Sequence, residues 1–494
     1  MPEPEPSDRV TETATASEPS IGILVVAYNA ATTLAQTLDR IPDDLRPRIR
    51  HVLVSDDESS DETEAIASEY AATSPLPVTV VRQPVNLGYG GNQQFGYRWM
   101  IDAGVDVVVL LHGDGQYAPE RLGDVVAPFA DHEIDVVLGS RMLDVGGARR
   151  GGMPLYKFVG NRILSTAQNA LTGLHLSEWH SGYRAFRTAA LARIPFERNS
   201  ADFDFDTEVL LQFLALGATI REVPIPTYYG DEICHVDGLR YARDVMSDVT
   251  RYRLGRMGFG SPAPGTGPDE YEWKDDPGSS HQRLLDDLLD RPAGRALDLG
   301  CGTGELGRRL VDVGWEVVGV DLAPGDAVAS YLAVIEADLE RDLPPEVAEH
   351  GPYDVVIAAD VLEHVRRPDR ILDACAPLLT EGGAMVASIP NVSHWYPRAR
   401  AVIGRFDYDE RGILDRDHVR FFTRRSIERL AQDQRWSVER LEPIGLPFDV
   451  ADRGAAEPGV GSALRRTVGW LDDVTVRLWP SMFAYQYLAV LTPR

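Results

Sequence analysis

A short acidic turn after an apolar run offers ligands for a divalent cation. The segment from Val105 to Leu122 reads VDVVVLLHGDGQYAPERL, and its first half has the composition of a buried strand. Asp114 and Gln116 follow that strand, and their oxygen atoms suit Mg²⁺ or Mn²⁺. Glycines on both sides of Asp114 allow a metal and a phosphate to approach the backbone closely. A cation held there could neutralise a diphosphate leaving group as its bond breaks.

Two earlier segments carry polar residues that could bind the rest of a nucleotide. Asp56 and Asp57 lie in VSDDESSDET at the end of another apolar run, where paired carboxylates can hydrogen-bond a nucleobase imide and ribose hydroxyls. These acids could also cap the helix that follows, and one role does not exclude the other. Asn86 and Gly88 begin NLGYGGNQQFG, a glycine-rich loop that is able to lie against a diphosphate.

The second half of the chain has its own succession of motifs at the ends of apolar runs. The candidate ligand-binding residues are Asp298, Gly300, Gly302, Gly304, Asp321, Asp338 and Asp360. The glycines let the backbone turn tightly and approach a ligand before the next helix. Asp321 could accept hydrogen bonds from two ribose hydroxyls, and Asp338 suits an adenine amino group. The glycine spacing also fits a dinucleotide fingerprint, so a Rossmann domain that binds NAD is an alternative.

Strands are expected to position these motifs, because each motif follows a short β-branched run. Such runs alternate with longer helical patterns in both halves of the chain. The runs that predict strands are 21–29, 49–57, 78–84, 105–113 and 134–141, followed by 295–302, 315–322, 333–339, 353–360 and 382–390. This alternation predicts an α/β protein with parallel sheets covered on both faces. In such sheets ligands bind at the carboxyl ends of the strands, where the motif residues stand.

The length and composition indicate several domains. The 494 residues exceed what one hydrophobic core usually supports. Apolar periodicity stops over a stretch rich in Gly, Pro, Ser and acidic residues. The predicted organisation is a disordered acidic tail over 1–20, a first domain over 21–254, a linker over 255–280 and a second domain over 281–494.

Charge and cysteine content narrow the possible surroundings and partners. The formal net charge of −27 disfavours general nucleic-acid binding, which needs a basic face. The sequence contains no recognisable secretory signal and no apolar run of about 20 residues. The three cysteines do not have metal-ligand spacing. Together these features predict a reduced cytoplasmic protein. The segment from Arg251 to Phe259 mixes arginines with apolar residues and could contact an anionic membrane at its inner face.

The sequence from Ile21 to Arg253 resembles the inverting GT-A glycosyltransferases of family 2, especially the branch that includes dolichol-phosphate mannose synthase. That family carries an Asp-x-Asp-x-Gln metal-binding turn. Asp114 and Gln116 match its second acid and its glutamine, whereas His112 replaces its first acid. The resemblance implies a GT-A fold, a nucleotide-sugar donor and a divalent cation held by Asp114 and Gln116.

The opening motif of that family, Pro-Ala-Tyr-Asn-Glu, is matched only in its centre, and Ala30 stands where the glutamate is frequent. The residues to which the resemblance assigns the donor are Ala27, Tyr28, Asn29, Asp56, Asp57, Asn86, Gly88 and Asp114.

The segment SEWHSGYR resembles the acceptor loop of the same family. On that resemblance Glu178 is the candidate base, His180 is the second candidate, and Arg184 anchors a phosphate or the loop. Glu178 could instead pair with Arg184 in a purely structural role. An acceptor that is already a phosphate anion, such as a polyprenyl phosphate, would need no base.

The sequence from Trp273 to Arg494 resembles class I S-adenosylmethionine-dependent methyltransferases, which have a Rossmann-like fold. The resemblance implies that the glycine-rich turn borders the methionine moiety, Asp321 binds the ribose and Asp338 binds the adenine ring. Residues 389–427 resemble methyltransferases found with glycan-building enzymes and would form the acceptor side of the pocket. His364 and His418 are the candidate bases, although either histidine could be structural.

Together these features predict a bifunctional enzyme of surface polysaccharide or glycolipid biosynthesis. The first domain would transfer a sugar from a nucleotide donor to a saccharide or polyprenyl phosphate, and the second would methylate a saccharide or glycolipid. The replaced acids at His112 and Ala30 leave a second hypothesis open, in which the first domain is a binding module without catalytic activity.

Overall fold

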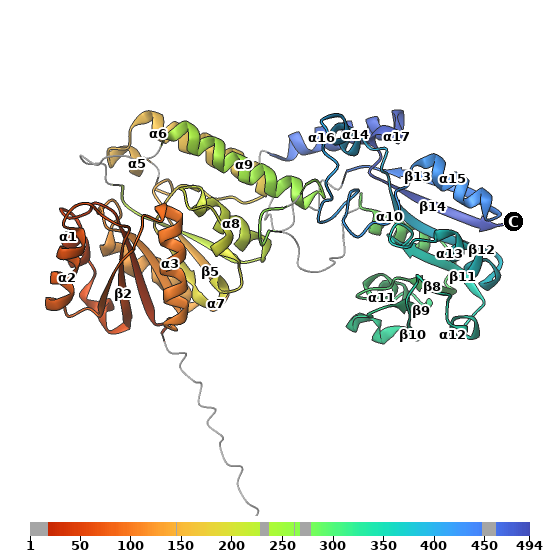
Figure 1. Cartoon of the computed structure of the whole chain (residues 1–494), viewed down its shortest axis with the longest axis horizontal. Coiled ribbons are helices and arrows are strands. Elements are labelled where there is room, and N and C mark those ends of the chain that lie inside the picture. The colour runs from red at the N-terminus through yellow and green to blue at the C-terminus, as the bar shows by residue number, and fades with distance from the viewer. Residues whose placement is uncertain (1–17, 145, 228–236, 261, 267–277, 447–460) are drawn as a thin grey trace, which may run out of the picture. The chain divides into compact units, whose positions relative to one another are not determined.

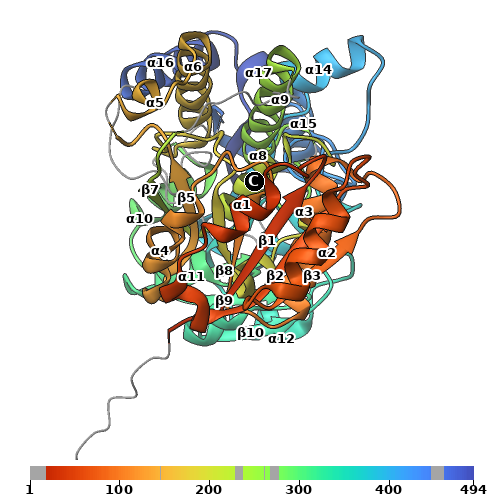
Figure 2. The same cartoon turned by 90° about the vertical axis from the view of Figure 1, so that its left-hand side faces the viewer.

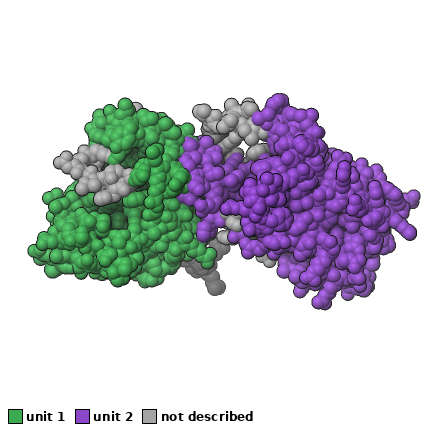
Figure 3. Space-filling model, turned by 45° about the horizontal axis from the view of Figure 1, so that its top comes forward, with its two compact units in different colours: residues 1–166, 176–245 green, residues 167–175, 246–494 purple. Residues whose placement is uncertain are grey.

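The computed structural model describes residues 18–144, 146–227, 237–260, 262–266, 278–446 and 461–494. The chain divides into two compact units, residues 1–166 with 176–245 and residues 167–175 with 246–494 (Figure 3). The boundary between residues 245 and 246 falls inside helix α9, Gly238–Arg256. Most of the predicted acidic tail, Cys234 and the centre of the predicted linker lie outside the described residues.

The first unit is built on a seven-stranded sheet in the order β3-β2-β1-β4-β6-β5-β7. Its strands are β1 (Ile21–Ala27), β2 (Ile49–Asp56), β3 (Val78–Arg82), β4 (Val107–His112), β5 (Ile134–Ser140), β6 (Arg184–Arg187) and β7 (Thr219–Pro224). Strand β6 runs antiparallel to β4 and β5, and the other neighbours are parallel. This is a GT-A-like arrangement, and the parallel strands β2, β1 and β4 bring their carboxyl ends to one edge.

Helices cover this sheet and complete the first hydrophobic core (Figures 1 and 2). They are α1 (Leu34–Asp39), α2 (Thr63–Thr73), α3 (Gly88–Asp102), α4 (Leu122–Val126), α5 (Gly147–Arg150), α6 (Leu155–Thr172), α7 (Thr188–Leu191), α8 (Phe205–Ala215) and the start of α9. Helix α3 packs closely on β1, because a Cβ atom at Gly96 would lie 2.3 Å from the Leu24 side chain. Leu24 and its neighbours in β1 are fully buried, as expected for a central strand.

The second unit is also built on a seven-stranded sheet, in the order β10-β9-β8-β11-β12-β14-β13. Its strands are β8 (Arg295–Leu299), β9 (Glu316–Asp321), β10 (Ala333–Glu336), β11 (Tyr353–Ala359), β12 (Leu379–Pro390), β13 (Trp436–Ile444) and β14 (Gln486–Pro493). Strand β14 is antiparallel to both β12 and β13, and the first five strands of the order are parallel. Strand order reverses beside β8, which is where a Rossmann-like sheet binds its ligand.

The helices of the second unit lie beside its sheet (Figure 1). They are α10 (Ser280–Leu289), α11 (Glu305–Val311), α12 (Pro345–Glu349), α13 (Pro368–Cys375), α14 (Trp395–Val402), α15 (Arg424–Asp433), α16 (Gly461–Leu478) and α17 (Pro480–Phe483). Among the described helices of either unit, none combines the length and apolarity that crossing a bilayer requires.

All ten segments predicted as strands form strands, and the α/β architecture with two domains is confirmed. The sheets are mixed, however, and the expectation of purely parallel sheets is wrong for β6, β13 and β14. Apolar composition indicates burial but carries no information about strand direction, so the antiparallel additions could not be read from it.

Candidate active sites

The donor-site residues predicted in the first unit lie at the carboxyl edge of three adjacent strands. Strand β1 is paired with β2 on one side and β4 on the other. Hydrogen bonds join the chain just beyond these strands, from the Asp57 amide to the Ala27 carbonyl at 2.9 Å and from the Gly113 amide to the Val26 carbonyl at 2.9 Å. The opening motif, the paired acids and the acidic turn are therefore brought together.

The two adjacent acids have different surroundings. Asp56 is fully buried and accepts a hydrogen bond from the Ser59 hydroxyl through Oδ1, while its Oδ2 has no partner among the described residues. Asp57 accepts hydrogen bonds from the amides of Leu87 at 2.7 Å and Gly88 at 3.1 Å. Burial raises the pKa of Asp57. Asp56 thus keeps a polar atom for a ligand, whereas Asp57 organises the start of α3.

The matched centre of the opening motif also supports the loops around it. Ala27 is buried at the end of β1, whereas Tyr28 is half-exposed. Asn29 has a left-handed backbone with φ of 50°, and its Oδ1 accepts a hydrogen bond from the Ser60 amide at 2.9 Å. At Ala30 the backbone amide donates to Thr63 Oγ1 at 2.8 Å. The backbone of the motif is therefore fixed, and the Tyr28 ring is available to a ligand.

The glycine-rich segment predicted as a phosphate loop forms the first turns of α3. Asn86 donates through Nδ2 to the Asp57 carbonyl at 2.9 Å. Gly88 has φ of 79°, and a Cβ atom there would lie 2.7 Å from the Ala201 carbonyl oxygen. A Cβ atom at Gly90 would meet the Ser200 carbonyl oxygen at 2.4 Å. The glycines allow α3 to approach residues 200–202, a packing role that their spacing did not reveal.

The predicted metal-binding turn follows β4 directly. Asp114 is exposed, and its Oδ1 accepts a hydrogen bond from the Gln116 amide at 2.9 Å. Gly115 between them has φ of 74°, a conformation that favours glycine. The turn places one carboxylate and one amide side chain on the same short loop. These residues fit a hard divalent cation, which takes oxygen ligands and completes its coordination with phosphate and water.

His112, which replaces the first acid of the family turn, belongs to a hydrogen-bonded chain. Its Nε2 lies 3.2 Å from the Tyr89 hydroxyl, which donates to Asp206 Oδ2 at 3.0 Å. Burial lowers the pKa of His112 and favours its neutral form. The Gly182 backbone packs on the imidazole, because a Cβ atom there would lie 2.7 Å from the ring. Tyr89 and Asp206 were not predicted as partners of this turn, since no sequence spacing links residues so far apart.

Glu178, the candidate base, is held in a buried ion pair with Arg141. Only 1% of Glu178 is exposed. Its oxygens accept hydrogen bonds from the Arg141 amide at 2.7 Å, from Arg141 Nε at 3.0 Å and from Asn161 Nδ2 at 2.8 Å. Burial opposes ionisation, but the guanidinium outweighs it and lowers the pKa of Glu178. Its partner is therefore Arg141, and the predicted alternative of a pair with Arg184 is wrong.

The other two residues of the acceptor loop are also buried. His180 Nδ1 lies 2.7 Å from the Tyr241 hydroxyl, and its Nε2 has no partner among the described residues. Burial lowers the pKa of His180 to about 4, so the ring is neutral near pH 7. Arg184 donates to the carbonyls of Ser181 at 2.8 Å and Trp179 at 2.7 Å. Arg184 thus anchors the loop, and the catalytic roles of Glu178 and His180 stay predictions.

In the second unit, the glycine-rich turn joins β8 to α11. Gly300, Gly302 and Gly304 all have positive φ, at 64°, 51° and 84°. Asp298 is buried in β8 and accepts a hydrogen bond from the Tyr331 hydroxyl at 2.8 Å. Burial raises the pKa of Asp298 to about 7. The turn exposes backbone beside this carboxyl, as the binding of a methionine moiety requires.

The residues predicted to bind ribose and adenine lie at the ends of the two strands next to this turn. Asp321 ends β9 and accepts hydrogen bonds from the amides of Gly302 and Ala323, both at 2.8 Å. Asp338 lies two residues beyond β10 and accepts a hydrogen bond from the Glu340 amide at 2.9 Å. Since β10, β9 and β8 are consecutive in the sheet, these acids and the glycine turn share one edge.

Asp360 follows β11 on the other side of the turn. It has φ of 53°, and its Oδ1 accepts hydrogen bonds from the Ser388 hydroxyl at 2.7 Å and Gln486 Nε2 at 2.8 Å. These partners come from β12 and β14, so Asp360 ties three strands together. No motif or spacing in the sequence indicates either partner.

The two candidate bases of the second unit are in contact. The rings of His364 and His418 have centroids 4.8 Å apart. His364 is exposed, whereas His418 and the adjacent Glu363 are buried. Burial and the nearby His364 lower the pKa of His418, and burial raises the pKa of Glu363 well above its usual value. The histidines and Glu363 thus form a compact cluster beside the end of β11.

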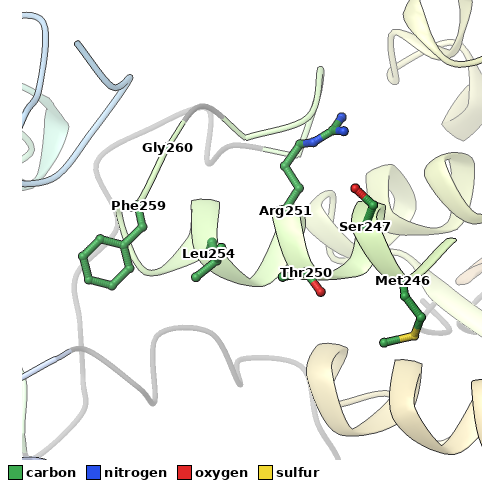
Figure 4. Close-up of a pocket in the computed structure, with 7 residues that line it drawn as sticks. All are labelled: Met246, Ser247, Thr250, Arg251, Leu254, Phe259 and Gly260. Carbon is green, nitrogen blue, oxygen red and sulfur yellow. The ribbon is translucent and has the colours of Figure 1, made fainter. Parts of the chain in front are cut away.

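The segment predicted to touch a membrane lines a pocket at the end of α9. Tyr252, Met257 and Phe259 are buried, so these apolar side chains are not available to a bilayer. A cavity of about 480 Å³ lies beside them (Figure 4). Its lining residues are Met246, Ser247, Thr250, Arg251, Leu254, Phe259 and Gly260.

Comparison with known families matches both halves of the chain. The glycosyl transferase family 2 model covers residues 22–194, and a methyltransferase domain model covers residues 273–441. Both resemblances inferred from the sequence are confirmed, and the second half matches a methyltransferase domain rather than the alternative Rossmann domain. A solved structure of glucosyl-3-phosphoglycerate synthase from Mycobacterium tuberculosis with UDP aligns with 48% of this chain and 80% of that chain, at 20% identity and a TM-score of 0.37.

Named relatives match each half separately. Undecaprenyl-phosphate mannosyltransferase of Micrococcus luteus is 32% identical over 203 residues, 41% of this chain and 81% of that protein. Polyprenol monophosphomannose synthase of Mycolicibacterium smegmatis is 29% identical over 204 residues, 41% of this chain and 75% of that protein. Ubiquinone biosynthesis O-methyltransferase of Psychrobacter cryohalolentis is 33% identical over 168 residues, 31% of this chain and 63% of that protein.

Proposed function

The chain belongs to glycosyltransferase family 2 and carries a methyltransferase domain, and we propose that its first unit transfers a sugar from a nucleotide donor to a polyprenyl phosphate. Its second unit would methylate a saccharide or glycolipid with S-adenosylmethionine. The two reactions would serve one route of surface polysaccharide or glycolipid assembly. Relatives of the first unit are named for polyprenyl-phosphate acceptors, which supports this choice.

The observation that carries the choice of acceptor is the engagement of Glu178 by Arg141. A hydroxyl acceptor needs a base to remove its proton as the new bond forms. The carboxylate predicted as that base is buried and accepts hydrogen bonds from Arg141 and Asn161. A phosphate acceptor is already anionic, so one of its oxygens can attack the anomeric carbon opposite the leaving nucleoside diphosphate without a base.

The donor would lie across the ends of β1, β2 and β4. Asp56 Oδ2, which is buried without a partner among the described residues, would accept hydrogen bonds from the nucleoside. Asp114 and Gln116 would hold Mg²⁺ or Mn²⁺, which when bound neutralises the charge of the diphosphate. The exposed Tyr28 ring would cover the base or ribose.

Helix α6 offers a surface for the membrane in which such an acceptor resides. Its first half exposes Leu155, Tyr156, Val159 and Ile163. No Asp or Glu occurs between Asp144 and Glu178 in a chain whose net charge is −27. An apolar stripe in an acid-free segment with Arg and Lys suits the interface of an anionic bilayer. Co-sedimentation with anionic vesicles should fall when Ile163 is replaced by Glu.

In the second unit, the glycine turn, Asp321 and Asp338 would bind S-adenosylmethionine. Asp360 would shape the floor of the acceptor pocket through Ser388 and Gln486. Methyl transfer from the sulfonium is an in-line displacement, so the protein must mainly align the acceptor and take up its proton. His364, which is exposed at this edge, would take that proton.

The test is calorimetric titration of the whole chain with UDP and GDP, each with and without Mn²⁺. We expect one of the two nucleotides to bind with metal dependence, and Asp114→Ala to abolish that dependence. Glu133→Ala is a matched control, because Glu133 is an exposed acid of the same unit outside the site. Sugar transfer is then assayed with a polyprenyl phosphate and with a neutral saccharide, and transfer only to the saccharide would overturn the proposed acceptor.

The neutral, hydrogen-bonded His112 favours one alternative, in which the first unit binds glycans or nucleotides without catalysis. That alternative predicts methyl transfer by the second unit together with no sugar transfer and no donor hydrolysis with any metal. The same assays therefore separate the two functions.

A further inference from the structure

Three side chains beside the end of β11 converge in a way that neither proposed reaction explains. Glu363 and His364 lie four and five residues beyond the end of the strand, and His418 comes from the loop after α14. One nitrogen of each imidazole and one carboxylate oxygen of Glu363 all lie within 4.8 Å of one another. A single ion can therefore reach all three ligand atoms after small side-chain movements.

Both imidazoles are oriented by backbone carbonyls. His364 Nδ1 lies 3.1 Å from the Asp417 carbonyl oxygen, and His418 Nδ1 lies 3.2 Å from the Ile413 carbonyl oxygen. A carbonyl oxygen can only accept, so each Nδ1 carries the hydrogen. The Nε2 lone pair of each ring is then available as a ligand, which is the arrangement that orients metal-binding histidines.

The carboxylate of Glu363 supplies an independent sign that something binds here. Only 1% of this residue is exposed, and neither of its side-chain oxygens has a hydrogen-bond partner among the described residues. Burying an unpaired carboxylate is costly, so such groups are normally paired or coordinate a metal. The backbone of Glu363 is fixed, because its carbonyl accepts hydrogen bonds from Val419 and Arg420, both at 2.9 Å.

We propose that Glu363, His364 and His418 bind one divalent transition-metal ion, with Zn²⁺ as the best match. Two imidazole nitrogens and one carboxylate oxygen are ligands that suit zinc, whereas Mg²⁺ prefers oxygen alone. Three protein ligands leave coordination positions open, as in catalytic rather than structural zinc sites. Asp360 and Asp415 add negative charge near Glu363 and favour a cation.

The role of this ion rests on the proposed methyl transfer, whereas its binding does not. The site lies at the carboxyl edge of the sheet, next to Asp360. With Nε2 of His364 bound to the metal, that ring could no longer take the acceptor's proton. The bound metal would instead lower the pKa of a hydroxyl that it contacts, so the acceptor hydroxyl could release its proton to water. The acceptor oxygen then forms a bond to the methyl carbon, the carbon–sulfur bond breaks, and its electron pair stays on sulfur to give S-adenosylhomocysteine.

The experiment is equilibrium dialysis of the whole chain against Zn²⁺, in the Asp114→Ala background to remove the predicted oxygen site. We expect one zinc per chain, with affinity at least about tenfold weaker in His364→Ala and in Glu363→Gln. His132→Ala is the control, because His132 is an exposed histidine of the other unit and should leave binding unchanged. Cobalt substituted for zinc should give visible absorption that His364→Ala removes.

Two outcomes would overturn the proposal: zinc binding that survives both variants, or an equal loss in His132→Ala. His364 is exposed, so its replacement should leave the fold intact, and calorimetric binding of S-adenosylhomocysteine checks this. A chain that binds zinc but no S-adenosylhomocysteine would keep the metal site and contradict the methyltransferase function. A chain that binds S-adenosylhomocysteine but no zinc would contradict the metal site and keep the methyltransferase function.

Discussion

Two glutamates, one in each unit, are equally buried and have opposite surroundings. Glu178 and Glu363 are each 1% exposed. The oxygens of Glu178 accept hydrogen bonds from Arg141 and Asn161, and the guanidinium lowers the pKa of Glu178. The oxygens of Glu363 have no partner among the described residues, and burial raises the pKa of Glu363. The Glu178 carboxylate stabilises the fold, and the Glu363 carboxylate is available to bind a proton or a metal.

Hydrogen-bond and ion-pair partners, rather than burial, indicate which acid has a structural role. Glu178 lies in the predicted acceptor loop and Glu363 lies beside the predicted base His364, so both could be taken for catalytic groups. A buried ion pair is disrupted at high cost when one partner is lost, whereas an unpartnered carboxyl loses little when it is made neutral. Replacing one carboxylate or its partner at a time measures how far this distinction holds.

The largest effect is expected from Arg141→Met, which leaves Glu178 buried without its counter-charge. Removing one member of a buried pair costs about 3–5 kcal/mol, so the first unit should unfold at a much lower urea concentration. Hydrogen exchange during urea unfolding measures each unit separately. The control is Arg240→Met, which breaks an exposed ion pair with Asp202 and should cost less than about 1 kcal/mol. If Arg141→Met and Arg240→Met lowered the free energy of unfolding equally, partners would not distinguish a structural acid from others.

Asp298 is an intermediate case, because it is buried with one hydrogen bond from Tyr331. Burial raises the pKa of Asp298 to about 7, above the value of about 3.9 in unfolded chains. Between these two pKa values the folded state holds a proton on Asp298 that the unfolded state has lost. This stabilising contribution is fully present below about pH 4 and is lost as the pH rises through 7. The loss across that whole range is about 4 kcal/mol by linkage, of which about 3 kcal/mol falls above pH 5.

Asp298→Asn should remove this pH dependence from the second unit. The measurement is urea unfolding of that unit, without S-adenosylmethionine, at pH 5 and pH 8. Wild type should lose more stability than the variant between the two values. A variant that loses as much as wild type would mean that Asp298 is ionised throughout and better solvated than its burial implies.

Asp114 is the exposed counterpart of these buried acids. Asp114→Asn should leave the stability of the first unit within about 0.5 kcal/mol, since the change is on the surface. It should lower kcat/KM for metal-dependent sugar transfer by about a hundredfold or more, as loss of one charge-stabilising group does in other enzymes. Steady-state assays across a Mn²⁺ series measure this. Unchanged transfer at low Mn²⁺ would place the cation elsewhere.

The sequence predicted the architecture and the edges where ligands bind, because both depend on local patterns. Apolar runs indicated ten strands, and the acids that follow β2, β4 and β9 lie at the expected edges. The partners of those acids were beyond prediction. Arg141 lies 37 residues before Glu178, and Gln486 lies 126 residues after Asp360. Such pairs are created by strand order, which composition does not encode. The structure was therefore needed to tell the carboxylates that have partners from those that have none among the described residues.

The smallest effect is expected from Glu363→Gln, and Glu178→Gln is its matched comparison. Burial raises the pKa of Glu363 well above its usual value and so favours the neutral carboxyl in metal-free protein. An amide of the same shape should therefore change stability by less than about 1 kcal/mol. The same replacement at Glu178 weakens charge-assisted hydrogen bonds and should cost about 1.5–3 kcal/mol. Urea unfolding with EDTA at pH 7 compares them. If Glu363→Gln destabilised its unit as strongly as Glu178→Gln, Glu363 would be ionised and paired in solution, and the contrast between the two units would fail.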